Sequence, residues 1–160
     1  MPAFHTSNVC RFPLINSSHG CATAIAERVI TRAASERIVR AAFELARQRA
    51  RPAGPKVTIV HKANVLRETC GLFRSAAFDI AADYPDVVAD ELLVDTAALR
   101  LVQRPEAFDV IVTTNLFGDI LSDLGPATAG TIGIAPSGNI NPERTAPSIF
   151  EPVHGSAPDI

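Results

Sequence analysis

The feature that most constrains the fold is an alternation of short β-branched segments with segments of helical periodicity. Residues 56–61 (KVTIVH) are compact and β-branched, which predicts a buried strand. Apolar residues then recur at three- and four-residue steps, which predicts a helix over 66–80. The alternation continues with a strand, a helix, a strand and a short helix at 91–94, 96–103, 108–114 and 118–124. This order indicates an α/β protein.

The flanking regions are less regular. An earlier helix is predicted over 33–50, and the proline- and glycine-containing segment 51–55 ends it. Residues 1–20 have no period and are expected to be irregular. Beyond Gly125-Pro126 the chain is rich in Gly, Pro, Ser and Asn, and such loops usually carry binding groups. Short extended pieces are expected at 26–31, 131–135 and 148–153.

Composition limits the class of protein. With 160 residues, 47% hydrophobic and 20% charged, the chain suits one globular domain with a real core. No apolar run approaches the roughly 18 residues of a membrane helix, so no membrane partner is expected. Three cysteines without CxxC spacing indicate neither a disulfide framework nor a zinc cluster. We therefore expect a reducing compartment, the cytoplasm or, in a eukaryote, the mitochondrial matrix.

Charge is divided unevenly along the chain. Residues 1–56 hold nine Lys/Arg and three Asp/Glu, whereas residues 57–160 hold six and fourteen. Most of the arginines in the first part fall inside the predicted helix, which favours a solvated helix face. No nucleic-acid recognition motif accompanies them, so no nucleic-acid partner is expected. Acidity in the second part suits a divalent cation near a ligand site.

Two aspartates lie in the segment 115–124, just after the last predicted strand. If the segment opens a helix, Asp119 and Asp123 project from one face, one turn apart. Like charges at this spacing repel by about 0.2–0.5 kcal/mol, and a cation would relieve the repulsion. Carboxylate ligands on a rigid element suit Mg²⁺ or Mn²⁺. The alternative is a pair of aspartates on a solvated helix edge.

Asp95 and Lys62 each follow a predicted strand. Asp95 precedes a helix, so it is either an N-cap or a functional carboxylate. Lys62 ends the buried strand, where α/β proteins place functional groups. It is either a surface charge or a lysine that anchors a carboxylate or acts as a base. The glycine-rich segment 130–139 has no GxGxxG pattern, so no ordinary dinucleotide site is indicated.

Several long motifs, in this order, resemble the β-decarboxylating dehydrogenases, the family of 3-isopropylmalate, isocitrate, homoisocitrate and tartrate/D-malate dehydrogenases. They are VITRAASERIVRAAFELAR from Val29, HKANVLRETCGLF from His61, VDTAALRLVQRPEAFDVIVTTNLFGDILSDL from Val94, APSGNINPE from Ala135 and FEPVHGSAPDI from Phe150. The resemblance covers residues 22–160 and leaves residues 1–21 irregular and unmatched. It implies the central, dimer-forming part of the isopropylmalate dehydrogenase-like α/β fold, incomplete at its N-terminal part and its C-terminal end.

The resemblance also implies roles for particular residues. Asp119 and Asp123 look like two ligands of Mg²⁺ or Mn²⁺, and Asp95 looks like a third ligand with a part in catalysis, supplied across a dimer interface. Lys62 looks like the catalytic lysine, likewise lent to the partner subunit. A carboxylate at Asp159 would repel a 2′-phosphate, which favours NAD over NADP. The cofactor contacts implied by the family motifs are Asn64, His154, Gly155, Ser156, Ala157 and Asp159.

The implied reaction is the NAD- and metal-dependent oxidative decarboxylation of a 3-substituted malate, a 2-hydroxy acid, by a homodimer with shared active sites. The family's substrate-binding arginines and proton-donating tyrosine are not identifiable, and Tyr84 lies in an unrelated turn. We therefore expect a truncated form with little activity of its own. The rival hypothesis is a non-catalytic regulatory subunit or a dimerising remnant of the same family. The sequence does not choose among the malates.

Overall fold

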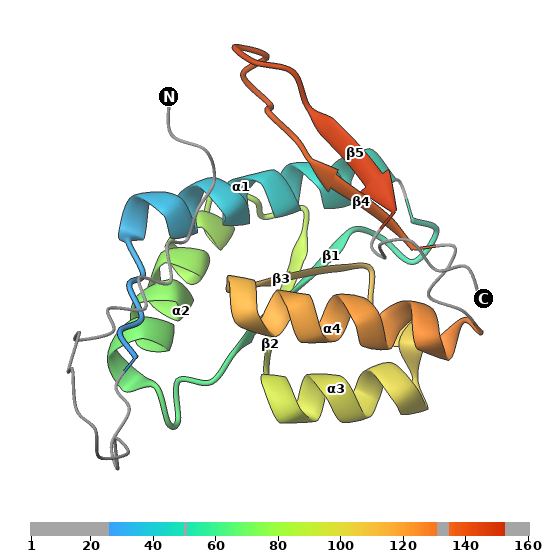
Figure 1. The fold of residues 1–160 in the computed structure, drawn as a ribbon, viewed down its shortest axis with the longest axis horizontal. Helices are drawn as coiled ribbons and strands as arrows, with labels where there is room; N and C mark the ends of the chain where they lie inside the picture. The colour runs from blue at the N-terminus through green and yellow to red at the C-terminus, as the bar shows by residue number, and fades with distance from the viewer. Residues whose placement is uncertain (1–25, 50, 131–134, 153–160) are drawn as a thin grey trace, which may run out of the picture.

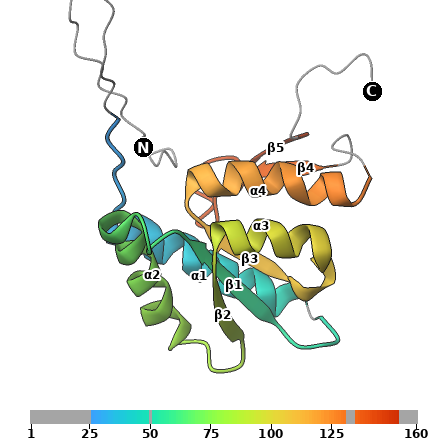
Figure 2. The same ribbon diagram turned by 90° about the horizontal axis from the view of Figure 1, so that it is seen from below.

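A three-stranded parallel sheet forms the centre of the molecule. The computed structural model describes residues 26–49, 51–130 and 135–152. The strands β1 (Lys56–His61), β2 (Val88–Leu93) and β3 (Val110–Thr113) lie in the order β2-β1-β3. The helices α1 (Arg32–Arg49) and α2 (Arg67–Ala81) cover one face, and α3 (Val94–Gln103) and α4 (Asn115–Thr128) cover the other (Figures 1 and 2). The α/β fold expected from the sequence is confirmed.

The central strand β1 forms where the sequence predicted it, because its side chains are buried on both faces. Val57 and Ile59 pack in the cluster made with α1 and α2, while Val60 packs with α3 and α4. A strand covered on both sides needs a continuous apolar run rather than an alternating one. Among the described residues, no helix is both long and apolar enough to cross a bilayer.

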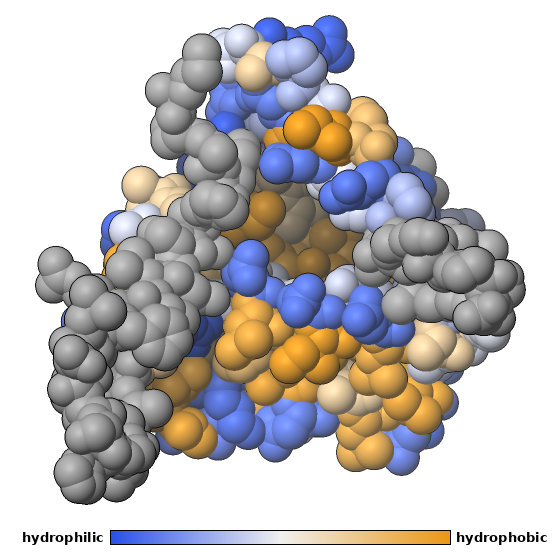
Figure 3. Space-filling view, in the orientation of Figure 1, coloured by the Kyte–Doolittle hydropathy of each residue, from blue (hydrophilic) through white to orange (hydrophobic). Residues whose placement is uncertain are grey.

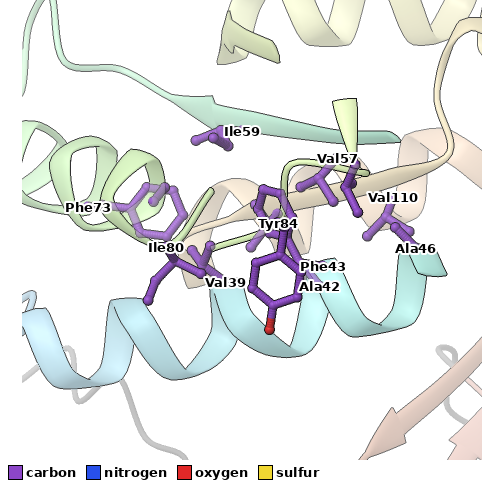
Figure 4. Packing of buried hydrophobic residues seen from close by; sticks show 13 residues of the cluster. Val39, Ala42, Phe43, Ala46, Val57, Ile59, Phe73, Ile80, Tyr84 and Val110 are labelled. Atoms are coloured by element: carbon purple, nitrogen blue, oxygen red, sulfur yellow. The ribbon is translucent and has the colours of Figure 1, made fainter. Parts of the chain in front are cut away.

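The larger core cluster lies between the sheet and the first two helices (Figure 4). Phe43 and Phe73 are its largest fully buried members, and the centroid of the Phe43 ring lies 5.0 Å from that of Tyr84. Tyr84 therefore has a core role, although it stands in the turn after α2. Its hydroxyl donates a hydrogen bond to Glu44, and burial is the main cause that raises its pKa.

The basic face of α1 is exposed to solvent, as predicted, but its arginines are also ion-paired. Most of the carboxylate partners come from the acidic second part of the sequence, although Arg32 and Arg47 also pair with Glu36 and Glu44 of α1 itself. From the second part, the partners of Arg32, Arg40, Arg47 and Arg49 are Asp79, Asp83, Asp86 and Asp109, respectively. The pairs in which both side chains are exposed contribute at most about 1 kcal/mol each, whereas the Asp109 side chain is only 1% exposed.

The helix α4 is longer than predicted. It spans Asn115–Thr128 rather than 118–124, and it continues through Pro126, which was expected to follow its end. A proline removes one backbone hydrogen bond, and here it does so in the last turn of the helix, where little further helix depends on it. The longer α4 places Asp119 in its second turn, close to the edge of the sheet.

Other boundaries shift in smaller ways. β2 begins at Val88, before the predicted residue 91, and α3 begins at Val94, before residue 96. Residues 26–31 form no strand. β3 spans Val110–Thr113 rather than the predicted 108–114, and a 3₁₀ helix, η1 (Pro105–Ala107), precedes it.

An antiparallel hairpin follows α4. Its strands are β4 (Pro136–Asn139) and β5 (Ile149–Pro152). β5 confirms the extended piece expected near 148–153, but β4 falls in a segment that the sequence indicated as a binding loop. Local composition could not reveal β4, because its backbone is extended by pairing with β5 rather than by its own residues. Residues 131–134 lie outside the described part.

Replacing either of two glycines that have open space around them by alanine is expected to change stability, but in opposite directions. Gly54 has φ +88°, so Gly54→Ala should destabilise the fold by about 1 kcal/mol despite the free space. Gly71 lies inside α2, so Gly71→Ala should stabilise by about 1 kcal/mol. Urea midpoints should shift in opposite directions, and a shift of both in the same direction would contradict the backbone argument.

Candidate active site

The sequence-predicted polar residues gather along the carboxyl edge of the parallel sheet. Lys62 directly follows β1, Asp95 lies in the first turn of α3 after β2, and α4 begins after β3. β1 and β3 are neighbours, yet the helices that follow them, α2 and α4, lie on opposite faces (Figure 2). In open α/β sheets, ligands bind outside the carboxyl ends of the strands at such a reversal.

The structure brings Lys62 and Asp95 together. Lys62 Nζ donates to Asp95 Oδ1 at 2.7 Å, because the parallel register sets His61 opposite Leu93 and so aligns the two strand ends. The lysine side chain is 23% exposed and the aspartate 63%, so the pair faces solvent from the sheet edge. The hydrogen bond from Lys62 is the main cause that lowers the pKa of Asp95.

The N-cap interpretation of Asp95 is wrong. The residue at the cap of α3 is Leu93, and no side chain caps the helix. Asp95 is therefore not the N-cap; its carboxylate accepts a hydrogen bond from Lys62 and also interacts with the backbone N–H groups of Asp95 and Thr96 in the first turn of α3. Lys62 is partly exposed and its ammonium is held by the Asp95 carboxylate, so the surface-charge and functional alternatives both remain open.

Asp119 and Asp123 lie one turn apart on α4, and both are exposed. Neither carboxylate has an ion pair or a side-chain hydrogen bond with the described residues. Two unneutralised carboxylates on one helical face fit a hard divalent cation, which takes oxygen ligands. Within the described part of this single chain, no three His, Cys, Asp or Glu residues converge on one point. A complete ligand set would therefore need groups from outside that part or from a second subunit.

The candidate cofactor residues lie mostly outside the described part of the chain. Asn64 is exposed in the turn between β1 and α2. His154, Gly155, Ser156, Ala157 and Asp159 lie outside the described residues. The strand β5 ends at Pro152, immediately before that segment.

Sequence reasoning missed Arg28 at the same edge of the sheet. Its guanidinium donates to the Thr114 hydroxyl, before α4, and to Cys70 Sγ at 3.3 Å in the first turn of α2. It also lies 5.1 Å from the centroid of the Phe117 ring. Arg28 thus ties the starts of α2 and α4 together. No periodic or motif signal surrounds it in the sequence, and only the fold reveals its position.

Sequence reasoning also missed a polar cluster behind Lys62, in which His61 is buried and Glu91 and Arg74 are partly exposed. His61 Nε2 lies 3.0 Å from Glu91 Oε2, and Arg74 binds both oxygens of the same carboxylate. The hydrogen bond from Arg74 is the main cause that lowers the pKa of Glu91, and the contact with His61 acts in the same direction.

The lowered pKa predicts how stability depends on pH. Because the folded-state pKa of Glu91 lies below its unfolded value of about 4.3, its contribution is fully present above that pH. The contribution is lost as the pH falls through the folded-state pKa. We expect Glu91→Gln to cost about 1 kcal/mol at neutral pH and almost nothing in strong acid, by urea unfolding at several pH values. The control is Glu106→Gln, an exposed residue of η1; an equal pH dependence in both variants would contradict the prediction.

Comparison with known proteins shows the family of the chain. Many α/β proteins bind ligands at the carboxyl edge of a parallel sheet. The carboxylates and the lysine at this edge therefore indicate a class of proteins and do not identify one protein. The family model described as isocitrate/isopropylmalate dehydrogenase matches residues 10–160. The chain therefore belongs to this family, as its motifs predicted. The match starts upstream of residue 22, where the motif resemblance begins.

Individual relatives are closely similar to the chain over most of its length. A 3-isopropylmalate dehydrogenase of Archaeoglobus fulgidus is 56% identical over 133 residues, which are 83% of this chain and 39% of that protein. A decarboxylating D-malate dehydrogenase of Escherichia coli is 53% identical over 136 residues, 85% and 37% of the two chains. The crystal structure of an isocitrate dehydrogenase from Methylococcus capsulatus aligns with TM-score 0.81 and 47% identity, covering 91% and 41%. The chain thus spans about two fifths of the length of these relatives.

Proposed function

We propose that this chain contributes the metal-binding and proton-transfer part of an NAD-dependent, Mg²⁺- or Mn²⁺-dependent enzyme that oxidatively decarboxylates a 3-substituted malate. The observation that carries the proposal is the Lys62–Asp95 pair, 2.7 Å apart at the carboxyl edge of the sheet, on a chain whose α4 presents two unneutralised aspartates. The proposal places substrate between these groups. The relatives named above act on isopropylmalate, D-malate and isocitrate, which share the 2-hydroxy acid unit.

The residues of this chain have distinct tasks in that reaction. Asp119 and Asp123 would hold the cation, and Asp95 would complete the ligand set from the other subunit. A bound divalent cation supplies Lewis-acid stabilisation of the negative charge that develops on the substrate oxygens. Lys62 accepts the proton that leaves the substrate hydroxyl at its Nζ. Asn64, in the next turn, would orient groups near the substrate and the nicotinamide.

The dimer that this arrangement requires has a suitable surface. The outer faces of α3 and α4 expose large apolar side chains, which Figure 3 shows gathered over the two helices. These side chains are Leu99, Val102, Leu116 and Ile120. An exposed apolar patch on adjacent helices is typical of a protein–protein interface. A homodimer through this face would place Asp95 and Lys62 of one subunit near α4 of its partner.

A chimera tests the proposal without depending on the length of this chain. The segment that matches the Archaeoglobus fulgidus 3-isopropylmalate dehydrogenase replaces the corresponding 133 residues of that enzyme. We expect NADH formation from NAD with a 3-substituted malate and Mn²⁺, and its loss with EDTA. Lys62→Ala in the chimera should lower kcat by at least about 100-fold, within the usual contribution of general acid–base catalysis.

Two outcomes would reject the proposal. A folded, dimeric chimera without turnover would favour the dimerising or regulatory role, and an active chimera unaffected by Lys62→Ala would remove the lysine from the mechanism. The matched control is Lys56→Ala, at the other end of β1, where the lysine pairs with Asp90 instead. The control should keep turnover close to that of the unsubstituted chimera.

A further inference from the structure

We propose that His61, held by Glu91 and Arg74, is a positioning residue that directs Lys62 toward Asp95. The proposal rests on the function proposed for Lys62 and identifies what sets its direction. His61 is the last residue of β1 and is only 4% exposed. A buried imidazole immediately before a functional lysine needs partners for both ring nitrogens, and the structure supplies both.

The two hydrogen bonds of His61 fix its tautomer. The backbone N–H of Ala63 donates to His61 Nδ1 at 3.1 Å, so Nδ1 carries no proton. Nε2 must then bear the proton and donate it to Glu91 Oε2 at 3.0 Å. Glu91 is itself held by Arg74 from α2, which donates to Oε1 at 2.7 Å and also binds Oε2. The ring is therefore tied to β2 and α2 on one side and to the turn on the other.

These contacts bracket the backbone of Lys62. The Ala63 N–H on its C-terminal side is held by the imidazole, and the Lys62 carbonyl accepts from the N–H groups of Val65 at 3.0 Å and Leu66 at 2.8 Å. With its carbonyl and the following peptide both bonded, Lys62 has little freedom to rotate. The turn is thus a fixed support for its side chain rather than a loose connection to α2.

The direction of Lys62 follows from the alternation along β1. Successive residues of an extended strand point to opposite faces of a sheet. His61 contacts Glu91, which Arg74 of α2 holds on the first face, whereas Lys62 reaches Asp95 on α3, the helix of the second face. Holding the histidine on the α2 side therefore turns the lysine toward the side that carries Asp95 and α4.

Trace acetylation of the whole chain tests the proposal, with the two lysines mapped by mass spectrometry. Lys56 and Lys62 are the two lysines of the sequence, so Lys56 is an internal reference at the opposite end of β1. His61→Phe removes both hydrogen bonds and should raise the Lys62:Lys56 labelling ratio at least about threefold, as the loss of one hydrogen bond predicts. His61→Asn keeps an acceptor near the Nδ1 position and should restore the wild-type ratio. An unchanged ratio in folded His61→Phe would overturn the proposal.

A second measurement covers the case in which His61→Phe does not fold. In the unsubstituted chain, ¹⁵N-histidine spectra should show His61 with an unprotonated Nδ1 and a protonated Nε2. A protonated Nδ1 would overturn the proposal, since it cannot accept from Ala63. Neither readout requires turnover. Failure of the chimera with a positive labelling result would therefore reject the proposed function alone, and the reverse pattern would reject the positioning role alone.

Discussion

Replacing both Asp119 and Asp123 by asparagine is expected to abolish Mn²⁺ binding by this chain. The two carboxylates lie one helical turn apart, exposed and without a basic partner among the described residues, so the ion would lose both charged ligands that α4 supplies. Mn²⁺ depends on anionic oxygen ligands, because it is a hard cation. Each single variant should weaken binding at least about tenfold, equivalent to about 1.4 kcal/mol, by titration calorimetry or by electron paramagnetic resonance.

The same substitutions should have the opposite effect on stability without metal. Like charges at this spacing repel, so Asp123→Asn should stabilise the metal-free chain by about 0.2–0.5 kcal/mol. A loss of binding combined with a small gain of stability distinguishes a metal site from a structural pair. Glu68→Gln, an exposed carboxylate in the first turn of α2, is the matched control and should leave Mn²⁺ affinity unchanged.

The proposed sharing between subunits makes binding depend on protein concentration. No three candidate ligands converge within the described part of one chain, so a third carboxylate has to come from elsewhere. If Asp95 of a second subunit supplies it, the apparent affinity for Mn²⁺ should rise as the chain dimerises, and Asp95→Asn should weaken binding without changing the monomer–dimer equilibrium. Equal Mn²⁺ binding by the wild type and by the double α4 variant would remove the metal site from this helix.

The sequence predicted those parts of the fold in which local pattern and burial agree. The β-branched residues of β1 favour a strand, and the burial of β1 on both faces requires the continuous apolar run that the sequence has. β4 could not be predicted, because Pro136, Ser137, Gly138 and Asn139 have little strand propensity and become extended only by pairing with β5. The end of α4 was also missed, because Pro126 was expected to follow the helix, whereas the helix accommodates this proline in its last turn.

The candidate site, too, could be predicted from the sequence only in part. Lys62, Asp95, Asp119 and Asp123 could be named from motifs, but the contact between Lys62 and Asp95 depends on the register of two parallel strands, which no local pattern encodes. Arg28 and Glu91 were invisible in the sequence, because each contacts, through its side chain, residues that are 17 or more positions away. Motifs thus name the candidate residues, and the fold shows which residues contact them.

Phe43→Ala is expected to produce the largest loss of stability in the chain, about 3–5 kcal/mol. Phe43 is fully buried between α1 and the sheet, where its ring contacts that of Tyr84 (Figure 4). Removing the ring leaves a cavity that α1 cannot fill, because Val39 and Ala46 on the same helix face are already packed in the cluster. Domains of this size are stable by only about 5–15 kcal/mol, so the variant should be close to unfolding.

Fluorescence of the single tyrosine reports on this cluster directly. The sequence has no tryptophan, and Tyr84 is its one tyrosine, so urea unfolding followed at tyrosine emission measures the environment of the Phe43 ring. Phe150→Ala is the matched control, because the same atoms are removed from a ring that is 71% exposed on β5. It should cost less than about 1 kcal/mol, since an exposed side chain leaves no cavity. Similar costs in the two variants would show that the cluster between α1, α2 and the sheet does not control the stability of the chain.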